Sequence, residues 1–416
     1  QDPTPIPNMF CIPFSPPRVG DYRFASDFNH KIVGRQTLLP YDGMPALGAM
    51  FVIKGHDPVS FDMERAYAWK ATADEHEVSL RKWAGAGIVK GGLAASAFAA
   101  FPHVATAATL AANKKINLAC CGVGNRGGAI INDLLKTGQF NVVALCDTQI
   151  GAKHTTGTVK KYPGVPRFQD FRKMLDKMGD QIDALSVGVP DHTHFPICMM
   201  AMALGKHVYV EKPLAHTVNE CDLLMQAEKK YKVAAQMGNQ GHSGDNYYQF
   251  RAWAKAGVLS NITRVDAPMT KGRRRHKWTA TVPGMRPGMP VPTEMDWDPW
   301  LGQTPHPEFH TDYINGDWRC WFEFGNGALG DWGAHIVDTA HEFLELGMPE
   351  EVKVEMMDGH NDFVFPMGST LRFKFPARGD KLPAMDIVWH DGIGNLPELP
   401  EGFHKTKASG LSLIHI

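Results

Sequence analysis

The amino-acid sequence predicts an α/β fold for the region that begins at Lys115. Three observations predict it. Short apolar segments of strand length alternate with helical segments between residues 116 and 237, polar residues cluster where the apolar segments end, and a glycine-rich turn follows the first apolar segment. Strands that alternate with helices form a parallel sheet with helices on its faces, so these observations predict a doubly wound domain.

The expected elements follow one another in a regular order. The expected strands are 116–121, 141–146, 182–189, 207–210 and 232–237, and the expected helices are 128–136, 195–204 and 218–231. Gly138 and Gly205 close the first two helices. In open parallel sheets, ligands bind at the carboxyl ends of the strands. The residues that follow each strand are therefore the candidates for function.

Composition and charge limit the class of protein. The chain has 416 residues, 44% hydrophobic and 21% charged, so it can bury a large core, and its length suggests about two to three domains. The formal net charge is −1, which excludes a global field that would attract nucleic acid. Seven cysteines lie at positions 11, 120, 121, 146, 198, 221 and 320 without a CxxC pair, so neither a disulfide framework nor a zinc ribbon is indicated.

The first 107 residues are expected to lie outside the fold. Residues 1–78 are expected to be an upstream segment, mostly rich in Pro, Gly and Asp and without periodicity. Residues 79–107 combine a basic pair at 81–82, an apolar run and the sequence ATA at 105–107, which is the order of a secretory signal. The basic pair resembles a degenerate twin-arginine (Tat) signal, for which Met63 would be a suitable initiator. This interpretation predicts an exported, periplasmic protein; the alternative is a surface helix with an Ala-rich linker in a cytoplasmic protein.

No membrane span is expected in the mature chain, and its C-terminus is expected to be incomplete. Lys90 and many Gly and Ala residues lie in an apolar run that is barely long enough to cross a bilayer. Residues 411–416 resemble a translated sequencing-library adapter, which would leave the region 241–410 without its natural end. The alternative is an ordinary terminal strand.

The turn after the first expected strand has the spacing G-x-G-x-x-G. Gly122 permits a tight turn, Gly124 lets the backbone approach a pyrophosphate, and Gly127 lets the next helix pack close to the strand. The second strand ends in Asp147, 20 residues after Gly127, where a carboxylate can accept hydrogen bonds from an adenosine ribose. This setting predicts a dinucleotide-binding (Rossmann) domain over residues 108–240, rather than glycines that only turn the chain.

The carboxylate of Asp147 also affects the choice of cofactor. It should repel the 2′-phosphate of NADP, so NAD is the expected cofactor and NADP the less favoured one. Arg126 or Lys153 could still pair with that phosphate and admit NADP.

Further motifs follow the later strands. They are Val189-Pro-Asp-His-Thr-His194, Glu211-Lys-Pro213 and Gly330-Asp-Trp-Gly-Ala-His335. With the glycine fingerprint, and in this order, they resemble the Gfo/Idh/MocA family, named after glucose–fructose oxidoreductase and inositol dehydrogenase. The resemblance covers residues 115–389. It implies an N-terminal Rossmann NAD(P)-binding domain and a C-terminal α/β domain over 241–410, which binds substrate and forms oligomer contacts, on an open, largely antiparallel sheet. Its candidate strands are 263–271, 351–357, 370–375 and 384–389.

The resemblance implies that Lys212, Asp331 and His335 perform the chemistry. The lysine would reach the substrate hydroxyl, the histidine would be the general base, and the aspartate would orient the substrate or the histidine. Loss of hydride from a carbinol requires removal of its O–H proton, and imidazole titrates near neutral pH. Asp331 and His335 are four residues apart, so both project from one face of a helix. The alternatives are a surface lysine before a turn-forming proline, a helix N-cap and a buried core histidine.

The expected cofactor site combines the fingerprint with the later strand ends. Its residues are Gly122, Gly124, Asn125, Arg126, Gly127, Asp147, Pro190, His194, Glu211 and Lys212. His192, His194, His341 and Glu342 would also suit a metal. Hydride transfer to NAD supplies the chemistry without one, and the family resemblance implies none, so no metal is expected.

Gln240, Trp318 and Arg319 are the expected substrate-binding residues. Trp318 and Arg319 belong to an aromatic stretch over 297–321, and a similar Trp-Arg pair precedes the Gly-Asp…His motif in many relatives. Aromatic rings stack on the apolar faces of pyranoses, and an arginine can bind hydroxyls or a carboxylate. The alternative is a hydrophobic core or subunit contact. The basic run at 271–278 is expected to be a solvated loop or a subunit contact rather than a phosphate site.

The sequence therefore predicts an NAD(P)-dependent oxidoreductase that transfers hydride between the nicotinamide and a ring carbon of a sugar, a sugar derivative or a cyclitol. A homo-oligomer, dimer or tetramer, is expected, and no nucleic-acid partner. Two alternatives stay open. Relatives with retained NAD cleave glycosides without net redox change, through a 3-keto sugar, with the same residues. The other alternative is a catalytically silent NAD-binding protein.

Overall fold

The computed structural model describes residues 11–12, 115–240, 245–269, 282–304, 307–379, 382–397 and 414–415. Apart from the two-residue strand Cys11–Ile12, the upstream segment 1–78 and the signal-like segment 79–107 lie outside these residues, as does the basic run at 271–278. Within the described part of the chain, no helix is long and apolar enough to cross a membrane.

The N-terminal domain is built on a six-stranded parallel sheet in the order β4-β3-β2-β5-β6-β7. Its strands are β2 (Ile116–Cys121), β3 (Phe140–Cys146), β4 (Arg167–Phe168), β5 (Ala184–Val187), β6 (His207–Glu211) and β7 (Ala235–Gly238). The five expected strands are confirmed, and β4 is an additional short edge strand. The strand order reverses between β2 and β5, and a sheet of this kind binds its ligand in the crevice above that point.

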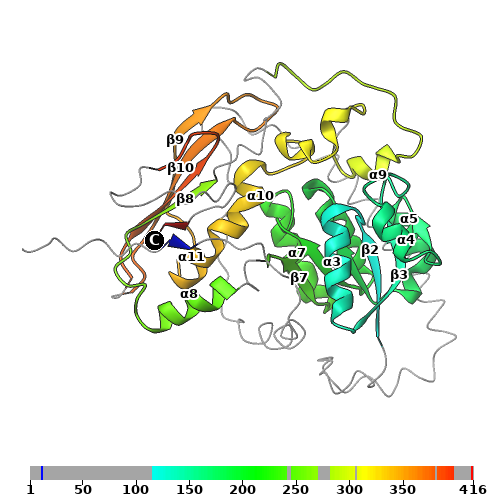
Figure 1. Cartoon of the computed structure of the whole chain (residues 1–416), viewed down its shortest axis with the longest axis horizontal. Helices are drawn as coiled ribbons and strands as arrows, with labels where there is room; N and C mark the ends of the chain where they lie inside the picture. Colours follow the sequence, from blue (N-terminus) through cyan, green and yellow to red (C-terminus); the bar gives the residue numbers. More distant parts are fainter. Residues whose placement is uncertain are drawn as a thin grey trace, which may run out of the picture. The chain divides into compact units, whose positions relative to one another are not determined.

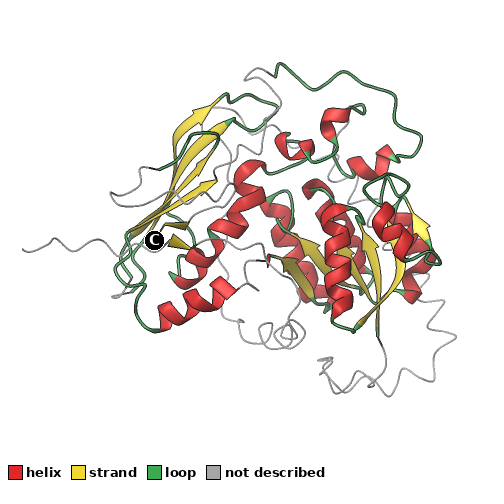
Figure 2. Ribbon diagram, in the orientation of Figure 1, coloured by secondary structure: helices red, strands yellow, loops and turns green. Residues whose placement is uncertain are grey.

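Helices cover both faces of the parallel sheet (Figures 1 and 2). They are α3 (Asn125–Lys136), α4 (Thr156–Lys161), α5 (Phe171–Met178), α6 (His194–Ala203) and α7 (Val218–Tyr231). Strand β2 contributes to two cores. Leu118 and Cys120 pack in the core beneath α3, and Ala119 and Cys121 pack in the core beneath α5, α6 and α7. A parallel strand that is buried on both faces reads as a continuous apolar run, which explains the sequence pattern.

The C-terminal domain is built on a mixed sheet in the order β1-β12-β8-β11-β10-β9. Its strands are β1 (Cys11–Ile12), β8 (Arg264–Met269), β9 (Glu351–Asp358), β10 (Gly368–Phe375), β11 (Met385–Asp391) and β12 (Ile414–His415). The pair β8–β11 is parallel and the other pairs are antiparallel, so the expected open, largely antiparallel sheet is confirmed. The four candidate strands predicted for this sheet correspond to β8, β9, β10 and β11. The helices of this domain are α8 (Asp245–Lys255), α9 (Trp297–Leu301), α10 (Gly327–Ile336) and α11 (Asp338–Phe343), and α10 packs against β8 and β11.

Most of the aromatic stretch over 297–321 forms a separate hydrophobic core. Trp297 and Trp300 of α9 stack with ring centroids 4.5 Å apart, and Trp321 is fully buried. Tyr313, from the 3-10 helix η5 (Thr311–Tyr313), packs edge-on against Trp321 at 4.9 Å. For Trp297, Tyr313 and Trp321, the alternative interpretation as a core contact is the correct one.

Candidate active site

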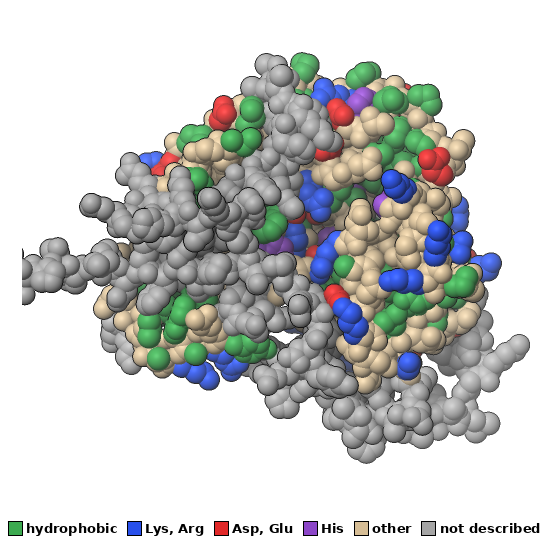
Figure 3. Space-filling view, viewed as in Figure 1, with side chains coloured by type: hydrophobic (Ala, Val, Ile, Leu, Met, Phe, Trp, Pro, Cys, Tyr) green, Lys and Arg blue, Asp and Glu red, His purple; other side chains and the backbone are tan. Residues whose placement is uncertain are grey.

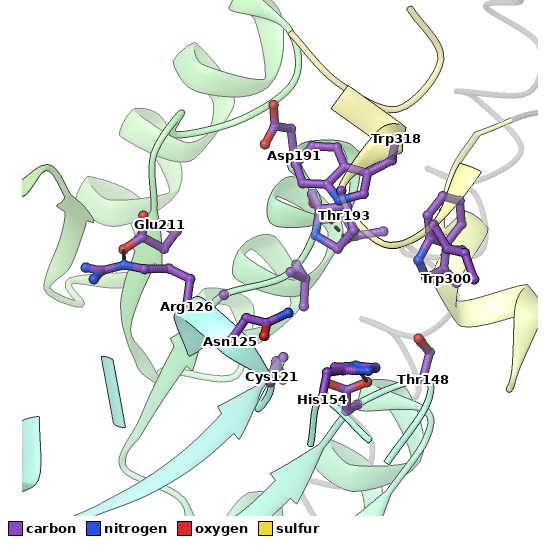
Figure 4. A pocket seen from close by; sticks show the side chains of 18 of the residues that line it. Cys121, Asn125, Arg126, Thr148, His154, Asp191, Thr193, Glu211, Trp300 and Trp318 are labelled. Atoms are coloured by element: carbon purple, nitrogen blue, oxygen red, sulfur yellow. Dashed lines mark hydrogen bonds and ion pairs between the residues drawn. The ribbon is translucent and has the colours of Figure 1, made fainter. Parts of the chain in front are cut away.

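A cavity of about 700 Å³ lies at the carboxyl ends of the parallel strands. Residues that follow β2, β3, β5 and β6 line one part of it, and residues of the 3-10 helix η6 (Asp317–Cys320) and of α10 line another. Most predicted site residues line this cavity: Gly122, Gly124, Asn125, Arg126, Asp147, Pro190, Glu211, Lys212, Gln240, Trp318, Arg319, Asp331 and His335. Figure 4 shows part of the lining, and in Figure 3 basic, acidic and histidine side chains gather at the hollowed centre of the face drawn.

The glycine turn between β2 and α3 has no room for side chains. Gly122 has a φ of +75°, and a Cβ on it would overlap the carbonyl oxygen of Gly188. A Cβ on Gly127 would overlap the carbonyl oxygen of Gly122. Helix α3 follows without an acidic residue in its first turn, so its N-terminal N–H groups and dipole favour an anion at the turn. The turn therefore fits the pyrophosphate of a dinucleotide, which must approach the backbone closely.

The carboxylate of Asp147 is fixed at the end of β3. Its Oδ2 accepts the backbone N–H of Val123 at 3.0 Å, and its Oδ1 accepts the backbone N–H of Gln149 at 3.0 Å. These hydrogen bonds hold the acid against the glycine turn. This is the position from which a carboxylate can accept the hydroxyls of an adenosine ribose.

Lys212, Asp331 and Arg319 form an ionic cluster that connects the two domains. The Lys212 ammonium donates to Asp331 Oδ1 at 2.7 Å and to the Asp331 carbonyl oxygen at 2.6 Å. The Arg319 Nε donates to the same Oδ1 at 3.2 Å. The Lys212 and Asp331 side chains are only 11% and 4% exposed. The fold thus joins residues that lie 119 positions apart in the sequence.

Comparison with protein-family models matches both domains. A model described as an oxidoreductase family, NAD-binding Rossmann fold, matches residues 116–239. A second, described as an oxidoreductase family, C-terminal alpha/beta domain, matches residues 247–375. Both are models of the same family, and together they cover more than half of the chain. The chain belongs to the Gfo/Idh/MocA oxidoreductase family.

Individual proteins match smaller regions of this Gfo/Idh/MocA oxidoreductase. The uncharacterized oxidoreductase YfiI of Bacillus subtilis is 31% identical over 156 residues, which is 36% of this chain and 38% of that protein. An alpha-N-acetylgalactosaminidase of Bacteroides fragilis is 26% identical over 196 residues, 43% of this chain and 46% of that protein. The matched regions thus span less than half of either relative. The structure of the WlbA dehydrogenase from Chromobacterium violaceum in complex with NADH and UDP-GlcNAcA covers 69% of both chains at 17% identity, with a TM-score of 0.50, and shows the same fold.

In this Gfo/Idh/MocA oxidoreductase, Asp331 and His335 both lie on α10 and both line the cavity. Asp331 lies inside the helix, whose N-cap is Asn326, so the alternative interpretation of Asp331 as an N-cap is wrong. His335 is 8% exposed, and its ring centroid lies 5.3 Å from that of Trp332. Helical spacing therefore does bring the acid and the imidazole to the same cavity.

The side chain of Arg126 turns toward the end of β6 rather than toward Asp147. Its Nε donates to Glu211 Oε1 at 2.9 Å, and Gln240 Nε2 donates to the same oxygen at 3.1 Å. The expectation that Arg126 could pair with the 2′-phosphate of NADP is not met by this geometry. Glu211 instead joins the expected cofactor residue Arg126 to the expected substrate residue Gln240.

His154 is a cavity residue that the sequence did not indicate. Its Nε2 lies 3.7 Å from Asp147 Oδ1, and its ring fills the space that a Cβ on Gly124 would need. The nearby carboxylate of Asp147 raises the pKa of His154, although partial burial opposes this. No sequence signal marks His154, because its role depends on how the chain after β3 folds back over the glycine turn.

His194 and Gly127 are the two predicted site residues that do not line the cavity. The two ring nitrogens of His194 lie 2.8 Å from the Pro213 carbonyl oxygen and 3.0 Å from that of Val189. Burial lowers the pKa of His194 to about 4. The ring of His194 thus connects the segment after β5 to the segment that carries Lys212.

No cluster of side chains that could form a metal site is found among the described residues. No group of three or more His, Cys, Asp and Glu side chains there could hold a metal ion, and cysteines 120, 121, 146, 198, 221 and 320 carry free thiols. His192 is buried, with its Nε2 2.7 Å from the Trp300 carbonyl oxygen. Its ring therefore connects the two domains through backbone oxygens.

Proposed function

We propose that this oxidoreductase transfers hydride between a nicotinamide cofactor, NAD in preference to NADP, and a ring carbon of a sugar, a sugar derivative or a cyclitol. The observation that most supports the proposal is the buried Lys212–Asp331 pair, in the same cavity as the glycine turn. The guanidinium of Arg319 lies 4.1 Å over the Trp318 ring beside this pair. An aromatic face and a cation next to a proton-donating lysine suit a hydroxyl-rich ring.

The roles proposed for the side chains follow from their contacts. NAD, when bound, supplies the hydride acceptor. The glycine turn and Asp147 bind its pyrophosphate and ribose. Lys212 donates a hydrogen bond to the substrate oxygen, while Asp331 fixes the ammonium group through two contacts. His335 takes up the carbinol proton, since an imidazole can hold that proton near neutral pH.

The first experiment measures nucleotide and turnover in the same preparation. Purified protein is denatured, the released nucleotide is identified as NAD or NADP, and native protein is screened at the nicotinamide absorbance band. The panel contains D-glucose, D-galactose, D-glucuronate, N-acetyl-D-galactosamine and myo-inositol, with their p-nitrophenyl glycosides where these exist. Reduction of added NAD by a free sugar or by inositol is the expected result. A protein that binds no nucleotide under any condition would refute the proposal.

A redox-neutral glycosidase that retains NAD is the second candidate. The Bacteroides fragilis relative, whose matched region covers 43% of this chain, is named an alpha-N-acetylgalactosaminidase. Such an enzyme would use the same lysine, aspartate and histidine. Stoichiometric retained NAD, release of p-nitrophenol and no net reduction of the cofactor would replace the dehydrogenase proposal with this one.

Replacing Asp147 by alanine is expected to raise the Kd for NAD by about 10- to 100-fold, because a charged acceptor of the ribose hydroxyls is lost. The variant also loses the acceptor of two backbone N–H groups, so the glycine turn loosens. The preference for NAD over NADP should shrink, because the carboxylate no longer repels a 2′-phosphate. Calorimetric titration with both nucleotides measures this. An Asp147→Ala variant that discriminates between them as the wild type does would contradict the role of Asp147.

Export and assembly are further proposals from the sequence. The signal-like segment 79–107 should direct the protein to the periplasm, and the C-terminal domain should form a dimer or tetramer. Cell fractionation with and without the basic pair at 81–82 tests the first. Light scattering of the purified protein tests the second.

A further inference from the structure

Asp191 is a buried carboxyl group in the cavity that the catalytic roles above do not use. It follows β5 and begins the 3-10 helix η3 (Asp191–Thr193). The residue is only 4% exposed and lines the cavity. Its side chain forms no hydrogen bond and no ion pair with any residue that the structure describes. A buried polar group without a partner requires an explanation, since such groups cost free energy.

Among the described residues, the charged groups around Asp191 form no ion pair with its carboxyl group. Burial raises the pKa of Asp191 to about 6, while Coulombic interactions with Arg319, Lys212 and His216 lower it and the interaction with Asp331 raises it. These groups come from η6, from the segment after β6 and from α10. Lys212 and Arg319 both direct their hydrogen bonds at Asp331 instead. Asp191 is therefore close to the ionic cluster but is not part of it.

The other carboxylates of the cavity already have donors. Asp331 Oδ1 accepts from Lys212 and Arg319, and Glu211 Oε1 accepts from Arg126 and Gln240. Asp147 accepts two backbone N–H groups at the adenosine part of the site. Among the described residues that line the cavity, Asp191 is thus the carboxylate that needs a donor from a ligand.

The position of Asp191 favours a substrate donor. Figure 4 draws Asp191 and Trp318 at one end of the cavity, and Thr148 and His154 at the other. His154 and Asp147 mark the adenosine end. Asp191 interacts electrostatically with Lys212 and Arg319, which belong to the proposed substrate end. The donors available there are the hydroxyls of a ring substrate and, from the cofactor, the nicotinamide amide and ribose hydroxyls.

We propose that Asp191 is a substrate-binding residue that accepts the hydrogen bond of a ring hydroxyl, one other than the hydroxyl that Lys212 contacts. It follows that the enzyme requires a polyol ring with at least two suitably placed hydroxyl groups. This inference rests on the proposed function. It adds to that function a specificity-determining residue for sugars and cyclitols, and a pH range in which the residue is effective.

The test compares the wild type with Asp191→Asn on the sugar or cyclitol of the panel that has the highest kcat/KM, and on its monodeoxy analogues. The variant should lower kcat/KM by about 10- to 100-fold, mainly through KM, because a hydrogen bond to a charged acceptor is weakened. With the wild type, the deoxy analogue that lacks the hydroxyl bound by Asp191 should show a similarly reduced kcat/KM. With Asp191→Asn, removal of that hydroxyl should reduce kcat/KM no further. The Kd for NAD should stay within about twofold of the wild-type value.

The pH profile gives a readout that a purely structural role would not change. Since the native pKa of Asp191 is about 6, wild-type kcat/KM should fall as the pH drops below that value, when the acceptor becomes protonated. Asp191→Asn should lose this contribution to the acid limb and keep the contribution that comes from protonation of the proposed general base, His335. Because the raised pKa means that ionisation destabilises the native state, the variant should melt at or above the wild-type temperature at neutral pH. Glu323→Gln is the control, since partial desolvation also raises the pKa of Glu323, but this residue is exposed and does not line the cavity.

Several results would overturn the assignment. A variant with a raised Kd for NAD and an unchanged KM would show that Asp191 faces the cofactor. A variant with wild-type kinetics and a wild-type acid limb would show that it binds neither ligand. A lower melting temperature with uniformly reduced parameters would show a structural role. Wild-type protein that binds no nucleotide under any condition would instead refute the proposed function, and this assignment with it, so the two failures are distinguishable.

Discussion

Replacing Lys212 by methionine is expected to lower kcat by about 10²- to 10⁴-fold, the range typical of a lost proton-transfer or proton-donating group. Methionine retains most of the length and volume of lysine, but it cannot donate to the substrate oxygen. Lys212 Nζ makes two contacts with Asp331, at 2.6 and 2.7 Å, so the fold places this ammonium accurately in the wild type. The Kd for NAD should change little, because the glycine turn and Asp147 remain. Stopped-flow kinetics and nucleotide titration measure the two parameters separately.

The same substitution should also reduce stability. Removing one partner of a buried ion pair costs about 3–5 kcal/mol when the other charge is left alone. Asp331 retains the Arg319 contact at 3.2 Å, so the loss should fall at or below the lower end of this range. Lys136→Met is the control, since Lys136 is 67% exposed at the side chain and its partner among the described residues is Asp133 on α3. A Lys212→Met variant with wild-type turnover would exclude Lys212 from the chemistry.

The parallel sheet and the glycine turn could be predicted because local sequence determines them. The apolar runs, Gly122 with its positive φ and the acid at the end of β3 all lie within one stretch of about thirty residues, the size of a βαβ unit. The start of α3 was less predictable. The helix begins at Asn125 instead of residue 128, so the last part of the glycine motif already belongs to the helix.

The candidate site was predictable only in part, because its remaining features depend on contacts between distant segments. The Val-Pro-Asp-His-Thr-His motif did not indicate that Asp191 would be buried without a donor, since that depends on Lys212 and Arg319 both turning to Asp331. The direction of Arg126 depends on Glu211, which lies 85 residues later. The sequence also could not separate core tryptophans from site tryptophans. Trp321 is fully buried in a core and Trp318 lines the cavity, although both lie within the same aromatic stretch.

Replacing Gly127 by alanine is expected to abolish measurable NAD binding and to lower the free energy of unfolding by about 3 kcal/mol, the upper range for forcing an extra group into packed structure. The added Cβ would overlap the carbonyl oxygen of Gly122, which is backbone and cannot rotate away. Either α3 must move away from β2 or the turn must open. Both changes displace the N–H groups that would hold the pyrophosphate, so stability and binding should fall together.

Gly157→Ala separates this steric effect from the general effect of adding a methyl group. Gly157 lies in α4, a Cβ there would meet nothing within 4 Å, and its φ is not positive. The substitution should therefore stabilise the protein by up to about 1 kcal/mol through helix propensity and leave NAD binding unchanged. Urea denaturation and calorimetric titration of the two variants measure both quantities. If Gly127→Ala bound NAD as the wild type does, close contact between α3 and β2 would not be needed for the nucleotide site. The assignment of the pyrophosphate to this turn would then be wrong, even though the chain has the family's fold.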